Sequence, residues 1–170
     1  DSDIKVNTDG SLTVRETQVV NFTGSFSFLN RDLVGTKASF SDGRSYGRVR
    51  YSDIKVYSLE GRPYESFKVE GIRDGRRVHI SFTALNEQTG WIIEYRMTGA
   101  IIYAEDYDRL YLNTVSIDRA VPIKSSRTTV KLPAGTDMTE VKTTQYTSGG
   151  LPEQDVTSGR DGDILWWQVA

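Results

Sequence analysis

The chain has 170 residues, the length of one domain, with 21 Lys and Arg against 23 Asp and Glu, a net charge of −2, and no cysteine. Balanced charges that form no basic block argue against a nucleic-acid partner and against a polybasic membrane contact. The lack of cysteine excludes disulfides, thiolate metal sites and cysteine nucleophiles.

Alternating apolar residues predict strands along most of the chain, because successive side chains of a strand point to opposite faces. The predicted strands contain Leu12 and Val14, Ile54 and Val56, and the ranges 67–72, 77–83, 91–98, 127–132 and 163–169. Asp74-Gly75 predicts the turn of a hairpin. Ser-Asp-Ile-Lys-Val occurs at 2–6 and 52–56, which indicates two similar strands. We therefore expect residues 1–170 to form a single all-β domain, an antiparallel immunoglobulin-like β-sandwich with little helix.

Titratable residues give no clear reaction. His79 lies on the polar side of its predicted strand, which favours a solvated residue over a general base or metal ligand. Glu105, Asp106 and Asp108 gather after an apolar run, but their spacing is typical of a turn and not of a calcium loop. We predict no catalytic residues, no metal and no cofactor.

Aromatic residues are the stronger signal. Buried rings supply core area, whereas exposed rings can stack on sugars. The alternation around Trp91 places this residue in the core. The candidate ligand-binding residues are Tyr107, Tyr111, Trp166 and Trp167. Because adjacent residues of a strand point opposite ways, we expect one of the two neighbouring tryptophans to be exposed or covered by a part of the protein outside this sequence.

Two stretches carry a family resemblance. The first joins an Ile-x-Val strand to Asp9-Gly10-Ser11-Leu12-x-Val14-x-Glu16, then an aromatic segment at 22–28 and Arg31. The second contains Glu94-Tyr95-Arg96-Met97, Gly99-Ala100-Ile101, Asp108-x-Leu110-Tyr111, Asn113, Val121-Pro122-Ile123 and Leu132-Pro133. Over about residues 3–135 the chain resembles the N-terminal domain of the predicted membrane-protein family domain-of-unknown-function 2207 (YciQ-like). Residues 136–170 are expected to form long connections and a final strand.

The resemblance implies an extracytoplasmic domain between a signal peptide and downstream membrane helices, with no assigned activity. Since the chain begins at Asp1, we expect the anchoring segments to lie outside this sequence. We expect a non-catalytic binding, sensing or structural module on the outer face of a bacterial membrane, with other envelope or membrane proteins as partners. Edge strands could pair with another chain. Arg31 is expected either to pair with a carboxylate or to bind a ligand.

Two alternatives stay open. The first is a module that binds cell-wall glycan through exposed Tyr and Trp rings. The second is a hydrolase of envelope polymers, which would need two acids, or His79 with a hydroxyl and an acid, converging in a cleft.

Overall fold

The computed structural model describes residues 1–35, 49–103, 105–114, 123–145 and 156–169. These ranges form strands, turns and irregular segments without a helix, so the prediction of an all-β fold is confirmed. None of the described segments is a helix long and apolar enough to cross a membrane.

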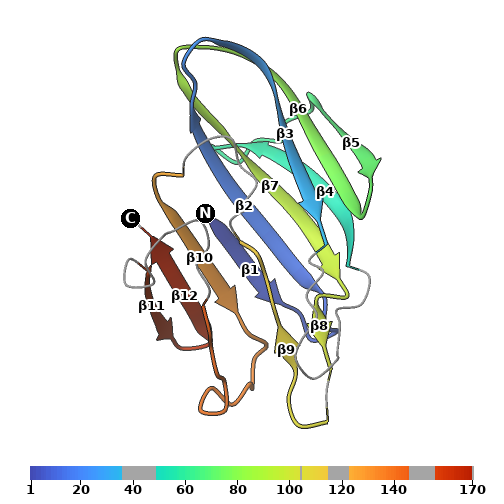
Figure 1. Cartoon of the computed structure of the whole chain (residues 1–170), viewed down its shortest axis with the longest axis vertical. Coiled ribbons are helices and arrows are strands. Elements are labelled where there is room, and N and C mark those ends of the chain that lie inside the picture. The colour runs from blue at the N-terminus through green and yellow to red at the C-terminus, as the bar shows by residue number, and fades with distance from the viewer. Residues whose placement is uncertain (36–48, 104, 115–122, 146–155, 170) are drawn as a thin grey trace.

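The larger sheet is mixed. Its seven strands follow the order β11 (Val156–Asp161), β12 (Ile164–Val169), β10 (Ser126–Lys131), β1 (Ser2–Val6), β2 (Leu12–Asn21), β7 (Gln88–Thr98) and β4 (Arg50–Ser58). All neighbours are antiparallel except β1 and β10, which run parallel. The parallel pair joins the C-terminal strands to the N-terminal strand in one sheet (Figure 1).

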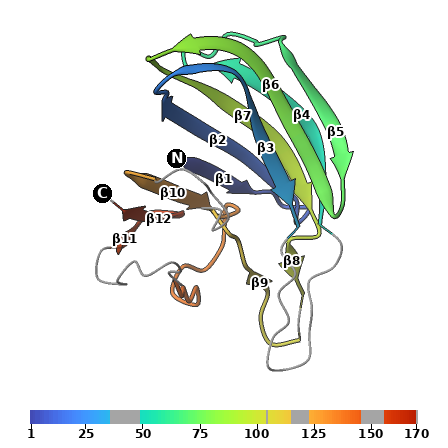
Figure 2. The same ribbon diagram turned by 45° about the horizontal axis from the view of Figure 1, so that its top comes forward.

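The smaller sheet lies over one half of the larger one. Its three strands follow the order β3 (Ser25–Val34), β6 (Gly75–Leu85) and β5 (Phe67–Ile72). Figures 1 and 2 show it above β2, β7 and β4, while β10, β12 and β11 extend to the side. A short ribbon of β8 (Ile101–Ile102) and β9 (Arg109–Leu110) lies beyond the end of β7.

The core lies between the two sheets. Alternate residues of β7, including Trp91 and Ile93, and alternate residues of β6, including Val78 and Ile80, are almost completely buried. The ring centroids of Phe82 and Trp91 lie 4.6 Å apart across the interface. Removing each large side chain from water contributes roughly 1.5–3 kcal/mol, which holds the sheets together. The prediction that Trp91 is a core residue is confirmed.

The immunoglobulin-like strand order is not confirmed. Seven strands with that topology would form sheets β1-β2-β5-β4 and β3-β6-β7. Here β7 lies between β2 and β4, and β5 pairs with β6. The pairing of β3 with β6 therefore lies within that of β2 with β7 along the sequence. The chain passes from β2 to β3, and later from β6 back to β7, at the same end of the molecule (Figure 1). A period of two residues predicts which face of a strand is buried but not which strand is its neighbour.

The predicted hairpin and C-terminal region can be compared directly. β5 and β6 are joined at Asp74, whose φ of 63° fits a tight turn, so the predicted hairpin is confirmed. The predicted strand 163–169 corresponds to β12, and β11 is an additional strand that the sequence pattern did not predict. The repeated pentapeptide lies in β1 and in β4, where a register shift and a φ of 53° at Asp53 interrupt the second copy.

Candidate functional site

β3 presents different chemistry on its two faces. Leu29 and Leu33 point toward the larger sheet, where both pack in the core, and Arg31 lies between them on the same face of β3. Phe28 and Asn30, which alternate with these residues along the strand, point away from the larger sheet. A charged residue in an apolar row is costly unless it is paired, so the inward position of Arg31 requires a partner.

The partner of Arg31 is Glu16 of β2, on the opposite sheet. The guanidinium donates from Nε to Oε2 at 2.8 Å and from Nη2 to Oε1 at 2.7 Å. The side chains are only 15% and 7% exposed. This bidentate geometry is the strongest form of a carboxylate–guanidinium contact. The sequence left open whether Arg31 pairs with a carboxylate or binds a ligand, and the structure shows the carboxylate pair.

Neighbouring polar groups complete the pair. The Tyr95 hydroxyl donates to Oε1 of Glu16 at 2.7 Å, and Gln18 Nε2 donates to Oε2 at 3.1 Å. Arg31 Nη1 donates to the backbone carbonyl of Asp32 at 2.6 Å. We call Glu16, Gln18, Arg31 and Tyr95 the inter-sheet latch. Both carboxylate oxygens accept two hydrogen bonds each, which satisfies a charge that burial would otherwise penalise.

Electrostatics keep the latch in one charge state. Burial alone would raise the pKa of Glu16, but the hydrogen bonds and positive charge of Arg31 outweigh it and lower the pKa. Burial and the Glu16 carboxylate raise the pKa of Tyr95 well above its ordinary value. At neutral pH the latch therefore holds an ionised carboxylate, a guanidinium and a neutral phenol. An acid held ionised in this way is suited to joining the sheets, not to donating protons.

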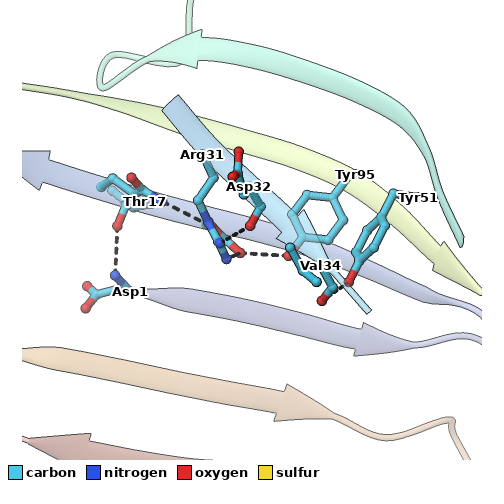
Figure 3. Close-up of polar contacts among 9 residues, drawn as sticks. Asp1, Thr17, Arg31, Asp32, Val34, Tyr51 and Tyr95 are labelled. Atoms are coloured by element: carbon cyan, nitrogen blue, oxygen red, sulfur yellow. Dashed lines mark hydrogen bonds and ion pairs between the residues drawn. The ribbon is translucent and has the colours of Figure 1, made fainter. Parts of the chain in front are cut away.

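Arg31 of the latch and the neighbouring Tyr51 cover part of the free edge of β3. Gly35 N donates to Asp74 O on the β6 side. The backbone N–H and C=O groups of odd-numbered residues therefore face β6, and those of even-numbered residues face the free edge of the sheet. Two backbone carbonyls on this free edge already accept hydrogen bonds. The carbonyl of Asp32 accepts from Arg31, and that of Val34 accepts from the Tyr51 hydroxyl at 2.9 Å (Figure 3). A partner strand would have to compete with these side chains along the C-terminal half of β3.

On the outward face, two cross-strand pairs of β3 and β6 form a small surface that we call the Phe28 face. Asn30 and His79 are opposite each other, as are Phe28 and Ser81. His79 Nδ1 lies 2.8 Å from Asn30 Oδ1, and the imidazole stacks on Phe28 with 5.3 Å between ring centroids and 21° between planes. The Phe28 side chain is nevertheless 52% exposed. A half-exposed ring is thus held in a fixed orientation by its neighbours.

Charged residues border this face and neutralise one another. Arg77 donates from Nε and Nη2 to the two carboxylate oxygens of Asp32, each at 2.7 Å. Lys68 Nζ lies 2.7 Å from a carboxylate oxygen of Glu70. Hydrogen bonds from Arg77 and Lys68 lower the pKa of Asp32 and of Glu70, respectively. These two pairs contribute two positive and two negative charges to the border at neutral pH.

The family described as predicted membrane protein (DUF2207) N-terminal domain matches residues 1–169. The chain belongs to this family. No curated protein matches the chain. The match extends through β11 and β12, beyond the stretch of 3–135 on which the resemblance rests, and includes β2, β3 and β7, the three strands that form the latch.

The predicted ligand-binding residues of this DUF2207 domain do not form one surface. Tyr107 and Tyr111 flank β9, which both views place apart from β12, where Trp166 and Trp167 lie (Figures 1 and 2). Tyr107 is 50% exposed, with the Arg109 guanidinium 5.2 Å from its ring centroid. Tyr111 is half-buried.

The two tryptophans lie on opposite faces of β12, and both are half-buried. Trp167 packs against the core. The ring of Trp166 lies over Gly159 of β11, where a Cβ would come within 2.7 Å of it, and Arg127 Cζ is 5.8 Å from the ring centroid. Neither tryptophan is fully exposed within this chain, because Gly159 lets the Trp166 indole cover the neighbouring backbone; cover by a part of the protein outside this sequence stays a prediction.

The remaining titratable candidates are placed as follows. His79 is half-exposed and bonded to an amide. Glu105, Asp106 and Asp108 are exposed, and within the described ranges no three potential metal-ligating side chains come together. Sequence reasoning missed Phe28 and Asn30 as site residues. The available signal was the period of two around Arg31, since one charge among inward apolar residues fixes which neighbours point outward.

Proposed function

We propose that this domain is a non-catalytic binding module, displayed on the outer side of a bacterial membrane as part of an anchored protein. The description of its family as a predicted membrane protein supports the anchoring. The observation that carries the binding role is the Phe28 face. A half-exposed aromatic ring is oriented by His79 on a strand whose other side is clamped by the Arg31–Glu16 pair.

Rigid support on both sides of β3 favours recognition. Binding costs less conformational entropy when the contact residues are already held in position. Inward residues of β3 are fixed by the latch, and outward residues are fixed by contacts with β6. The domain therefore presents a small preorganised surface.

The bonding of the candidate acids and base favours binding over catalysis. Glu16 is ionised and bonded to Arg31 and Tyr95, and His79 is oriented by the amide of Asn30. An amide oxygen can orient a catalytic imidazole, but the hydrolase alternative requires His79 to meet a hydroxyl and an acid, and the contacts of His79 described above are with the Asn30 amide and the Phe28 ring. The hydrolase alternative gains no support from these contacts.

The edges of β3 and β4 favour recognition through side chains over strand addition. Along β3, the side chains of Arg31 and Tyr51 donate hydrogen bonds to two backbone carbonyls on the free edge. Along β4, Ser58 N donates to Arg62 O at 2.8 Å and Tyr64 N donates to Val56 O at 2.9 Å, so the following segment covers this edge. Natural proteins protect edges in these ways against unwanted pairing. The partner is therefore expected to contact exposed side chains such as Phe28.

Binding can be tested by co-sedimentation of the purified domain with a bacterial envelope fraction. The Phe28→Ala variant is expected to lose binding, because it removes the exposed ring. Val19→Ala is the matched control, since Val19 is also 52% exposed but lies on the outward face of the larger sheet. Equal binding by Phe28→Ala and the unaltered domain would show that the Phe28 face is not the binding surface.

Localisation can be tested separately because this chain contains no cysteine. Leu85, whose side chain is 65% exposed, is replaced by Cys in the parent protein. A membrane-impermeant maleimide is expected to label this position in intact cells. Labelling only after the membrane is permeabilised would place the domain inside the cell and contradict the proposal.

A further inference from the structure

We infer that the Phe28 face binds an uncharged part of a saccharide, an inference that rests on the proposed binding function and specifies its ligand. The surface combines one exposed aromatic ring with several fixed hydrogen-bonding groups, and the charged side chains described along its border are paired with one another. A sugar ring has the matching composition, since it offers an apolar C–H face surrounded by hydroxyl groups.

The apolar contact is the free side of the Phe28 ring. His79 covers the other side at 5.3 Å, in a nearly parallel stack, and this accounts for an exposure close to one half. The imidazole also prevents the ring from turning toward the sheet. A sugar that stacks on the free side buries apolar area without first having to order the ring.

The polar contacts have defined donor and acceptor roles. An amide oxygen can only accept, so the 2.8 Å contact of Asn30 Oδ1 with His79 Nδ1 fits the tautomer with its proton on Nδ1. In that tautomer Nε2 is an acceptor, and the Asn30 amide nitrogen keeps its two donor hydrogens. Ser81 is exposed opposite Phe28 and adds a hydroxyl that can donate or accept. Hydroxyl groups of a sugar both donate and accept, so this set is complementary to them.

The spacing of these groups fits a small cyclic ligand. Phe28 and Ser81 form one cross-strand pair, and Asn30 and His79 form the next outward pair. Neighbouring strands lie about 4.8 Å apart, and successive outward residues of a strand lie about 7 Å apart. The four side chains therefore mark the corners of a patch on which one sugar ring can contact the aromatic and polar groups together.

The charges at the border favour an uncharged ligand group. Arg77 is bidentate to Asp32, and Lys68 is paired with Glu70, so these two cations already have an anion. A phosphate or carboxylate would have to displace one of these partners. A purely apolar peptide would remove water from Asn30 and His79 without replacing their hydrogen bonds, which is unfavourable.

The test uses an envelope fraction divided into four samples: untreated, digested with protease, oxidised with periodate, and extracted with organic solvent. Periodate cleaves vicinal diols of sugars, protease removes proteins, and solvent removes lipids. The inference predicts binding after protease digestion and loss of binding after periodate. Solvent extraction then distinguishes a glycan polymer, which stays in the pellet, from a glycolipid headgroup, which is removed.

Substitutions localise the contact. Phe28→Ala is expected to weaken binding to the protease-treated fraction at least about tenfold, and Asn30→Ala and Ser81→Ala several-fold each, since a lost hydrogen bond or ring contact is worth about 1 kcal/mol or more. Val19→Ala is expected to bind normally. Binding should change little between low and high salt, because the ligand group is uncharged. Circular dichroism and urea melts confirm that each variant is folded.

The outcomes separate this inference from the proposed function. Phe28-dependent binding that protease abolishes would overturn the saccharide inference and leave a protein-binding module. Phe28-dependent binding that falls steeply with salt would overturn the assignment of an uncharged ligand. Binding that is absent, or that is equal for Phe28→Ala and Val19→Ala, would overturn both.

Discussion

Replacing Glu16 by Gln would test whether the inter-sheet latch holds the two sheets together. The substitution keeps the shape of the side chain and removes its charge. The Arg31 guanidinium, only 15% exposed, would then lack its counter-ion. Breaking a buried ion pair from one side typically costs about 3–5 kcal/mol. For a domain of this size that loss corresponds to a melting temperature lower by roughly 6–20 °C.

Two further variants show whether the loss comes from the pair. Arg31→Met leaves the Glu16 carboxylate unpaired and should destabilise the domain by a similar amount. The double variant carries neither charge, so its loss should be well below the sum of the single losses, as expected for directly coupled residues. The matched control is the Arg15–Glu94 pair, which joins β2 to β7 on the outward face with side chains 42% and 30% exposed. Glu94→Gln should cost no more than about 1 kcal/mol.

Urea denaturation followed by tryptophan fluorescence measures these differences through the transition midpoint. The signal should report the core directly because Trp91 lies between the sheets, next to Phe82. The reasoning would be refuted if Glu16→Gln destabilised the domain no more than Glu94→Gln. It would also be refuted if the single losses were simply additive in the double variant.

Three other predictions follow from individual residues. Folding lowers the pKa of Glu16 below its ordinary 4.5, so the ionised carboxylate stabilises the domain above that pH, and this contribution is lost as the pH falls through the folded-state pKa. The free energy of unfolding, measured by urea melts from pH 7 to pH 3, should therefore decrease less steeply for Glu16→Gln than for the unaltered domain. Burial raises the pKa of Tyr51 from 10.0 to about 12, so the free energy of unfolding should decrease as the pH rises across this interval. An equal decrease in the Tyr51→Phe variant would contradict this assignment. Gly159→Ala should displace the Trp166 ring, since the added Cβ would lie 2.7 Å from it, and should cost about 1–3 kcal/mol in urea melts; an unchanged midpoint would show that the ring moves freely.

Strand positions could be predicted well because they depend on local alternation. The pattern around Trp91 placed this residue in the core, and Asp74 marked the β5–β6 turn. β11 was missed because Val156–Asp161 contains a glycine and mostly polar residues without alternation. This strand is held by its pairing with β12, which a local pattern does not contain.

The candidate site was only partly predictable. Sequence reasoning identified Arg31 and the possibility of a carboxylate partner, but any of the 23 acids in the chain could have filled that role. Aromatic content directed attention to Trp166 and Trp167, whose rings the sheet itself covers. Phe28 was considered only as part of an aromatic segment. Its importance depends on His79, which lies opposite its neighbour Asn30 across the β3–β6 pair.

By itself, the sequence determined an all-β chain, the buried face of its clearest strands and its family, because these follow from local periodicity and from residues in fixed order. The tertiary structure alone decided which strands became neighbours. Packing of the small sheet on the large one brought Arg31 to Glu16, and pairing of β3 with β6 brought Phe28, Asn30 and His79 together. These contacts join residues distant in the chain, and their energies depend on burial and geometry that arise only when both sheets have formed.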